Sequence, residues 1–265
     1  MIPYPKITFN MEKYRKLLPF YGDISQMLCY TGRRSSERSG NMARNVVCFG
    51  DSNTYGYCGD PGDCADGVRF SGEERWTGLL QKKLGEGFRI CEEGVVGRTT
   101  AFDDPMRPGM NGLKELPSVL KGYGTVDLLI LMLGTNDTKE RFASSAECIS
   151  IGMERLIAKA KSVECWTNGK PNILLIAPPH ILDGLYDGPF GGSMGTGCPQ
   201  KSRELANFYQ AVAQRRGCAF LDAEGVAEFN RTDCMHLTRK GHAALAQKLA
   251  QMVPQLVSND EKQSV

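Results

Sequence analysis

The sequence lacks the features of a membrane protein, a secreted protein or a nucleic-acid-binding protein. Its 265 residues contain no apolar stretch long enough to span a bilayer. The N-terminus has no basic segment followed by an apolar core and a small-residue cleavage site, so we expect a cytoplasmic protein. The net charge at pH 7 is only +2, which excludes a strong attraction to nucleic acid or to an anionic membrane. We therefore expect neither as a partner.

Cysteine patterns that bind metals are also missing. The ten cysteines are scattered, and no Cys-x-x-Cys pair occurs. Cys58 and Cys64 flank a loop of glycine and aspartate, whereas Cys48 and Cys91 fall in predicted strands and resemble small buried apolar residues. We therefore expect no metal site, and free thiols of a reducing cytoplasm rather than a disulfide framework.

Composition divides the chain into three segments. Residues 1–43 mix Pro, Tyr, Lys and Arg and end in a polar run, which indicates an N-terminal appendage with a linker. Within this segment, residues 11–30 fit one amphipathic helix, and Met42 is an alternative start of translation. Residues 44–256 form the predicted globular domain, and residues 257–265 form a polar tail.

Apolar runs alternate with amphipathic segments from residue 44 onward. Most of the runs are nearly continuous, which is typical of strands buried on both faces of a parallel sheet. Strands are predicted at 46–49, 88–92, 126–133, 172–176 and 219–221. Helices are predicted at 74–84, 113–121, 145–163, 201–216 and 238–253. This order predicts a doubly wound, three-layer α/β/α sandwich on a five-stranded parallel sheet, with ligands at the carboxyl ends of the strands.

A serine stands where the first predicted strand ends. The run Gly-Asp-Ser-Asn-Thr at 50–54 directly follows that strand. Serine after Gly-Asp is most often a turn or helix-capping residue. At this position Ser52 is also a candidate nucleophile with its hydroxyl directed into a cleft.

His236 is one of three histidines and has a carboxylate three residues before it, Asp233. An ordinary hydrogen-bonded loop histidine would need no such neighbour. One turn of chain lets Asp233 reach Nδ1 of the imidazole, which fixes the tautomer and leaves Nε2 free to take a proton from Ser52. His180 and His242 have no such pairing; we expect His180 at the rim of the cleft and His242 in a structural or surface position.

Two further strand-end residues are suited to holding an oxyanion. Asn136, in Gly-Thr-Asn-Asp at 134–137, offers a neutral side-chain amide, although such a residue also caps helices. Gly97 follows the second predicted strand, and without a side chain its N–H can closely approach a substrate oxygen. The N–H of Ser52 would be the third donor.

These blocks together resemble a GDSL-type esterase of the SGNH hydrolase superfamily. The family's serine, glycine, asparagine and histidine fall in order on Ser52, Gly97, Asn136 and His236, with the acid at Asp233. The likeness covers about residues 45–253 and is strongest to the arylesterase/acyltransferase branch, in the segments 75–78, 92–94 and 133–139. It implies a flavodoxin-like SGNH catalytic domain, a small-molecule ester as substrate, no cofactor, and in some members oligomers and acyl transfer to alcohols.

The chain departs from that branch at several positions. Asn53 stands where the family's name motif has Leu. Tyr55 and Tyr57 stand where the branch tends to carry Trp, so the pocket walls and transfer to alcohols are expected to differ. Residues 1–43 have no counterpart.

Other residues near the motifs have structural interpretations. We expect Asp51 and Asp137 to brace their turns by accepting backbone N–H bonds. Arg98 could bind an acidic substrate, but a solvated arginine or one paired with Asp103 or Asp104 is the more ordinary case. Residues 183–199 hold six glycines and two aromatics, and we interpret them as a flap over the cleft or a long surface loop.

Three functions remain open from the sequence. The first is hydrolysis of small acyl esters, such as acetyl esters, through an acyl-enzyme. The second is removal of acetyl groups from carbohydrates on the same scaffold. The third is a non-catalytic binding module at the same sheet edge, although no Gly-x-x-x-x-Gly-Lys or Gly-x-Gly-x-x-Gly is present to hold phosphates.

Overall fold

The computed structural model describes residues 43–262 of the chain. The predicted N-terminal appendage up to residue 42, its helix at 11–30 and Met42 itself lie outside these residues. Within the described part of the chain, no helix combines the length and the apolar character needed to cross a membrane.

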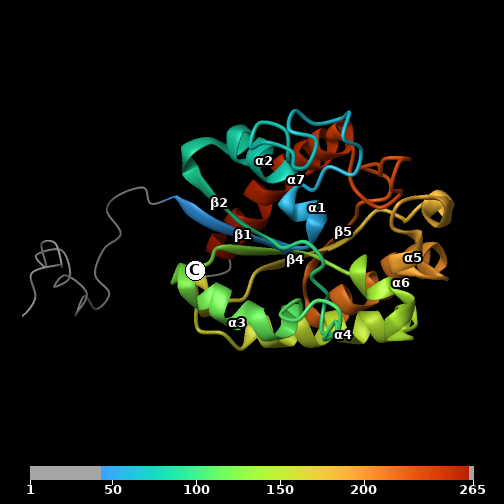
Figure 1. Ribbon diagram of the computed structural model, residues 1–265. Helices are drawn as coiled ribbons and strands as arrows, with labels where there is room; N and C mark the ends of the chain where they lie inside the picture. The colour runs from blue at the N-terminus through green and yellow to red at the C-terminus, as the bar shows by residue number, and fades with distance from the viewer. Residues whose placement is uncertain (1–42, 263–265) are drawn as a thin grey trace, which may run out of the picture. The chain divides into compact units, whose positions relative to one another are not determined.

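Five strands form one sheet at the centre of the described residues (Figure 1). They are β1 (Arg44–Gly50), β2 (Phe88–Gly94), β3 (Leu128–Met132), β4 (Ile173–Ala177) and β5 (Ala219–Asp222). Their order is β2-β1-β3-β4-β5, and every neighbouring pair is parallel. The predicted five-stranded parallel sheet is confirmed, and its order is that of flavodoxin-like folds.

Helices cover both faces of this sheet (Figure 1). One face carries α2 (Trp76–Leu84) and α7 (Arg239–Lys262), and the other carries α3 (Gly112–Tyr123), α4 (Ala146–Lys161) and α6 (Cys198–Arg216). The shorter helices are α1 (Ser52–Tyr55), α5 (Gly191–Met194), η3 (Gly85–Gly87), η4 (Asn136–Thr138), η5 (Glu140–Phe142), η6 (Thr167–Gly169) and η7 (Asp183–Asp187). The three-layer α/β/α sandwich is therefore also confirmed.

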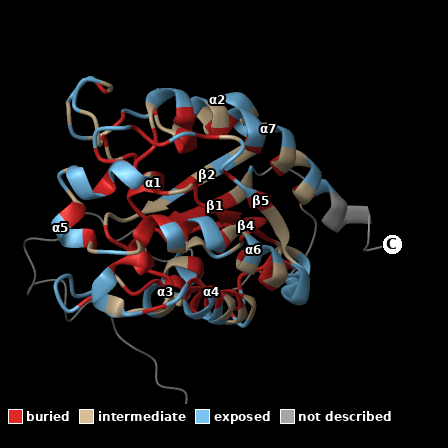
Figure 2. Ribbon diagram, turned by 90° about the vertical axis from the view of Figure 1, so that its right-hand side faces the viewer, coloured by how far each residue is buried: buried red, intermediate tan, exposed pale blue. Residues whose placement is uncertain are grey.

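The central strands β1, β3 and β4 are mainly apolar because each contributes to two cores. In β1, Val46 and Cys48 belong to the cluster under α2 and α7, whereas Val47 and Phe49 belong to the cluster under α3, α4 and α6. All four side chains are fully buried, and the strand ribbons at the centre are red in Figure 2. Burying each large apolar side chain contributes about 1.5–3 kcal/mol, so both helical layers are held on the sheet mainly by this packing.

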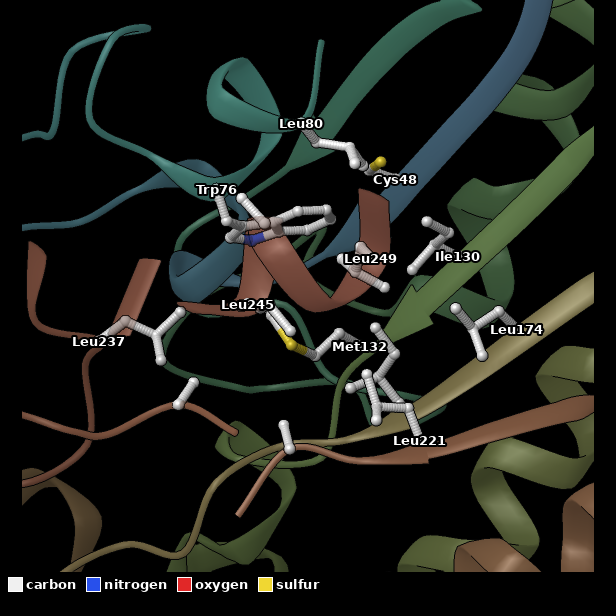
Figure 3. Packing of buried hydrophobic residues seen from close by; sticks show 14 of the residues in the cluster. Cys48, Trp76, Leu80, Ile130, Met132, Leu174, Leu221, Leu237, Leu245 and Leu249 are labelled. Atoms are coloured by element: carbon white, nitrogen blue, oxygen red, sulfur yellow. The ribbon is translucent and has the colours of Figure 1, made fainter. Parts of the chain in front are cut away.

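The core under α2 and α7 is packed around the indole of Trp76 (Figure 3). The Trp76 N–H groups are satisfied: the indole Nε1 donates to the Asn53 carbonyl at 3.1 Å, and the backbone N donates to His242 Nδ1 at 3.2 Å. Leu245 and Leu249 of α7 belong to the same cluster. This packing ties α2 and α7 to the segment that follows β1.

Two helices extend three or more residues beyond a predicted end. α6 begins at Cys198 rather than at residue 201, because Gly197 takes a left-handed conformation with φ of 78° and proline fits the first helical turn. α7 runs to Lys262 rather than ending at 253, so it extends into the segment predicted as a polar tail. Val257 in this extension is buried in the core under α2 and α7.

One expectation about the cysteines is wrong. Cys58 and Cys64 form a disulfide, with their Cα atoms 6.3 Å apart. The loop between them turns back on itself and brings the two side chains within bonding distance. The prediction of free thiols rested on an expected reducing cytoplasm, and the conformation of this loop is not evident from the sequence. The other cysteines of the described residues are free thiols.

Candidate active site

The carboxyl ends of the neighbouring strands β2, β1 and β3 lie level with one another. Gly50 at the end of β1 is in register with Gly94 of β2 and Met132 of β3. The first turn of α1 is pressed against this edge. A Cβ on Gly50 would lie 2.0 Å from Thr54 Oγ1, and a Cβ on Gly94 would lie 2.1 Å from the Tyr55 nitrogen. Both positions therefore need glycine to let α1 approach the sheet.

Ser52 is the first residue of α1 and is 4% exposed. The preceding Asp51 caps the helix, because its Oδ1 accepts a hydrogen bond from the Asn53 nitrogen at 2.9 Å. Asp51 thus braces its own turn, as predicted. The cap fixes the direction in which the Ser52 hydroxyl leaves the turn.

Ser52, His236 and Asp233 form one chain of hydrogen bonds. Ser52 Oγ lies 2.8 Å from His236 Nε2, and His236 Nδ1 lies 2.7 Å from Asp233 Oδ2. His236 is 3% exposed and Asp233 is fully buried, so little water competes for either bond. The structure therefore brings Ser52 together with the Asp233–His236 pair, which lies about 180 residues further along the sequence.

Asp233 is held as a carboxylate by its neighbours. Its Oδ1 accepts hydrogen bonds from the backbone nitrogens of Met235 and His236, both at 3.2 Å. Burial by itself would raise the pKa of Asp233, but hydrogen bonds and the nearby His236 ring lower it below its ordinary value. An ionised Asp233 can accept a hydrogen bond from the Nδ1–H of His236, which leaves Nε2 as the acceptor facing Ser52.

Sequence reasoning missed Asn230. Its Nδ2 donates to Asp233 Oδ1 and to the His236 carbonyl, both at 2.9 Å, while its Oδ1 accepts from the nitrogens of Thr232 and Asp233. This one side chain therefore fixes the turn that carries both the acid and the base. An asparagine three residues before an aspartate is too common to have been recognised as a signal.

Asn53 was noted only as a departure from a family motif, yet it contacts the same turn. Its Nδ2 donates to the Met235 carbonyl at 3.2 Å, and its Oδ1 accepts from the Leu237 nitrogen at 3.0 Å. These bonds bracket His236 from both sides. The side chain of Asn53 thus connects the turn of the serine to the turn of the histidine.

The three predicted oxyanion donors lie around one cavity of about 590 Å³. Ser52, Gly97 and Asn136 all line it, together with His236. Neither the Ser52 N–H nor the Gly97 N–H donates to another group among the described residues. Asn136 Nδ2 donates one bond to the Arg98 carbonyl at 3.2 Å, which orients the amide. These donors can converge on an oxygen bound beside Ser52.

Asp137 was predicted to brace its own turn, but its carboxylate instead holds a different segment of the chain. Its Oδ1 accepts from Thr100 N at 2.8 Å and from Thr100 Oγ1 at 2.5 Å, so it holds the segment that contains Gly97. Burial raises the pKa of Asp137 to about 6, with a smaller contribution from Asp51. Burial likewise raises the pKa of Asp51 to about 6. Both carboxyl groups lie behind the cavity and are not among its lining residues.

The expectations for Arg98 are wrong. The residue is 4% exposed, and its guanidinium carbon lies 3.9 Å from the centre of the Phe49 ring. Nη1 donates to the Gly50 carbonyl at 2.9 Å and also to the Glu93 carbonyl. Arg98 therefore joins the carboxyl ends of β1 and β2 instead of facing solvent, an acidic side chain or a substrate. Neither the carbonyls nor the stacked ring could be identified from the sequence.

The other two histidines lie apart from the cavity. His180 was expected at its rim, but it does not line it; its Nδ1 lies 3.5 Å from Glu224 Oε1. His242 is fully buried and structural, because its Nδ1 accepts the bond from Trp76, and burial lowers its pKa to about 3.

The segment 183–199 forms one wall of the cavity. It is not a structureless loop, since it contains η7 and α5, and Leu185 and Met194 are buried. Phe190 of this segment and Tyr57 have ring centres 5.9 Å and 4.6 Å from that of His236. The aromatic rings therefore enclose the imidazole on the cavity side.

Comparisons with known proteins identify the family of this chain. Residues 48–244 match the GDSL-like lipase/acylhydrolase family. The aryl esterase of M. smegmatis is 36% identical, with a TM-score of 0.73 over 81% of this chain and 100% of that chain. A carbohydrate acetylesterase family member from Sinorhizobium meliloti is 32% identical, with a TM-score of 0.73 over 81% of this chain and 99% of that chain. No match was found among curated proteins.

Proposed function

Because this chain belongs to the GDSL-like lipase/acylhydrolase family and is a carboxylic ester hydrolase, we propose that it cleaves small acyl esters through an acyl-enzyme on Ser52. The observation that carries the proposal is the buried chain of bonds of 2.8 Å and 2.7 Å from Ser52 through His236 to Asp233. Acetyl esters are the simplest substrates of this class.

In the proposed mechanism the Ser52 hydroxyl gives its proton to His236 Nε2 while Oγ attacks the ester carbonyl carbon. Asp233 accepts a hydrogen bond from the Nδ1–H of His236 and stabilises the imidazolium that forms. The tetrahedral intermediate collapses when the bond to the alcohol oxygen breaks and His236 returns its proton to that oxygen. Water then repeats the sequence on the acyl-enzyme, and an alcohol in place of water would give acyl transfer.

The carbonyl oxygen becomes negative in each tetrahedral intermediate. The N–H groups of Ser52 and Gly97 and the amide of Asn136 are the proposed donors to it. The loss of one such donor costs about 10²–10³ in rate in enzymes of this kind. Asn136→Ala should therefore lower kcat by about that factor.

The test compares Ser52→Ala with Ser150→Ala on 4-nitrophenyl acetate. Ser150 is a buried serine whose hydroxyl donates to the Glu147 carbonyl within α4, outside the cavity. We expect Ser52→Ala to lose turnover and Ser150→Ala to retain it. A fluorophosphonate should label the wild-type chain on Ser52. Turnover by Ser52→Ala at the wild-type rate would refute the assignment of the nucleophile.

Removal of acetyl groups from carbohydrates is a second candidate. The acetylesterase from Sinorhizobium meliloti favours it, since that relative is 32% identical over most of both chains. Tyr57 lies beside His236 at the position where the arylesterase branch tends to carry Trp, so the alcohol side of the pocket differs. Acetylated sugars and aryl acetates assayed side by side would separate the two substrates. A preference for the sugars would favour this candidate.

A further inference from the structure

The cavity beside Ser52 contains a group of cations. Of the residues that line it, Arg107, Lys139 and Arg141 are basic and none is acidic. The rest of the wall is largely apolar, with Val96, Met106, Phe190 and Met194 among its members. A neutral acetyl ester would need no such charge, and the mechanism proposed above uses none of the three cations.

Among the described residues, Asp104 is the carboxylate that forms ion pairs with these cations. Asp104 is fully buried behind the wall, with its Oδ2 3.4 Å from Lys139 Nζ and its Oδ1 3.2 Å from Arg141 Nη1. Among the described residues, Arg107 makes no ion pair; its Nη1 lies 3.5 Å from the Val96 carbonyl. Three positive charges therefore face one negative charge at this wall.

Lys139 is unusual because its side chain is only 8% exposed. A buried ammonium is costly unless it is paired, and its one carboxylate contact is long. Burial lowers the pKa of Lys139, and the positive charges of Arg141 and Arg107 lower it further. The Asp104 carboxylate has the opposite effect and raises this pKa. An additional anion in the cavity would reduce the repulsion between Lys139 and the two nearby arginines.

Of the three cations that line the cavity, Arg107 lies on its oxyanion side. A Cβ on Gly97 would be 2.9 Å from Arg107 Nη1, so the guanidinium rests against the proposed oxyanion donor. The alcohol part of a substrate must lie toward His236, which protonates it, beside Tyr57 and Phe190. The acyl part is directed away from His236, so the cations are placed to meet that part.

We propose that Arg107, Lys139 and Arg141 form a subsite for a carboxylate on the acyl part of the substrate, so that hemiesters of short dicarboxylic acids are preferred. The proposal rests on the ester hydrolysis proposed for Ser52 and specifies its substrate class. Guanidinium groups suit a carboxylate because they offer two parallel N–H donors.

The test compares monoethyl succinate with ethyl succinamate, its neutral isostere, by titration of released acid at pH 7. Hydrogen bonds to charged groups contribute enough that we expect kcat/KM to favour the hemiester by about 10- to 100-fold. Arg107→Gln should reduce that ratio toward 1. Arg215→Gln, at a surface arginine paired with Glu154 on the far side of α6, should leave the ratio unchanged.

Hydrolysis of 4-nitrophenyl acetate by the same preparation separates this inference from the proposed function. Turnover of the acetate with a hemiester ratio near 1, or a ratio that Arg107→Gln does not change, would overturn the subsite alone. No turnover of any ester would overturn both. A preference for 2-acetoxyethyl phosphate over ethyl acetate, with no preference for the hemiester, would place the anion on the alcohol and also overturn the proposal.

Discussion

The side-chain amide of Asn53 holds the backbone on both sides of His236. Its oxygen accepts from the residue after the histidine at 3.0 Å, and its nitrogen donates to the residue before it at 3.2 Å. Asn53 is the neighbour of Ser52 in α1, so its amide links the position of the base directly to that of the nucleophile. We regard Asn53 as a positioning residue because it acts through His236 and does not line the cavity.

Replacement of Asn53 by leucine, the residue of the family's name motif, should lower both activity and stability. The Met235 carbonyl and the Leu237 nitrogen would each lose a partner in a buried place, and each unsatisfied group costs about 1–3 kcal/mol. Displacement of His236 should reduce kcat/KM on 4-nitrophenyl acetate by about 10- to 100-fold. Enzyme assays and urea unfolding measure the two effects.

Asn172→Leu provides the control. Asn172 precedes β4 at the opposite end of the sheet, and its Nδ2 donates to the Asp127 carbonyl at 3.0 Å and the Leu256 carbonyl at 3.1 Å. Its replacement should lower the free energy of unfolding and leave kcat/KM unchanged. Equal activity losses in the two variants would mean that Asn53 acts only through stability.

The sequence predicted those parts of the molecule that depend on local pattern. Nearly continuous apolar runs predicted β1, β3 and β4, which are buried on both faces, and weaker apolar patterns predicted the edge strands β2 and β5. Ser52, Asn136 and the segment with Gly97 each follow a predicted strand, and parallel strands end at one edge of the sheet. Their proximity to His236 in the structure follows from that rule, whereas their catalytic roles stay predictions.

What the sequence missed depends on contacts between distant residues. Asp137 was assigned to its own turn but bonds Thr100, and Arg98 was assigned to solvent or to a carboxylate but lies on Phe49. In each case the residue type was compatible with several partners, and only the packed fold selects one. The Cys58–Cys64 disulfide was missed for a different reason, because it joins residues only six apart and depends on the conformation of the loop between them.

The pH dependence of stability should reveal the buried carboxyl group of Asp137. Burial raises its pKa from the ordinary 3.8 to about 6, so the folded state holds the proton more tightly than the unfolded chain does. Its contribution to the free energy of unfolding is therefore greatest below pH 4 and decreases as the pH rises to about 6. Unfolding by urea at a series of pH values measures this decrease.

Asp137→Asn should remove that decrease, so the variant should gain stability relative to the wild-type chain between pH 4 and pH 6. Asp103→Asn is the control, because Asp103 is exposed and its hydrogen bond with Lys114 lowers its pKa. Removal of Asp103 should produce no such gain. A stability difference for Asp137→Asn that does not change with pH would contradict the prediction.

Phe190 should contribute to the binding of aromatic leaving groups. Its ring lies 6.2 Å from that of Tyr57 and 5.9 Å from that of His236, on the side where the alcohol part leaves. Contacts between aromatic rings contribute about 0.5–1.5 kcal/mol, so Phe190→Ala should reduce the preference for phenyl acetate over ethyl acetate by about 2- to 10-fold. The ratio of the two kcat/KM values measures this preference.

Phe142→Ala is the matched control for Phe190. Phe142 packs on Phe102 with ring centres 5.4 Å apart and does not line the cavity. The ratio of the two kcat/KM values should therefore stay at the wild-type value in this variant. A Phe190→Ala enzyme with an unchanged ratio would show that the leaving group does not meet the ring.

Gly59 should be essential for the position of the acid. This glycine lies in the loop closed by the Cys58–Cys64 disulfide, and a Cβ at this residue would be 1.8 Å from Asp233 Oδ2 and 2.7 Å from Asn230 Nδ2. Asp233 Oδ2 is the oxygen that lies 2.7 Å from His236 Nδ1. Gly59→Ala must therefore displace the carboxylate and break this bond, and we expect kcat to fall by about 100-fold.

Gly62→Ala tests the same loop without touching the acid. A Cβ at Gly62 would meet nothing closer than Asp60 Oδ1 at 3.5 Å, which is an ordinary contact distance. We expect this variant to keep the wild-type kcat, since neither the disulfide nor Asp233 is disturbed. If Gly59→Ala kept the wild-type kcat as well, the contact between the disulfide loop and Asp233 would have no part in catalysis. If both variants lost activity equally, the effect would belong to the flexibility of the loop rather than to the carboxylate.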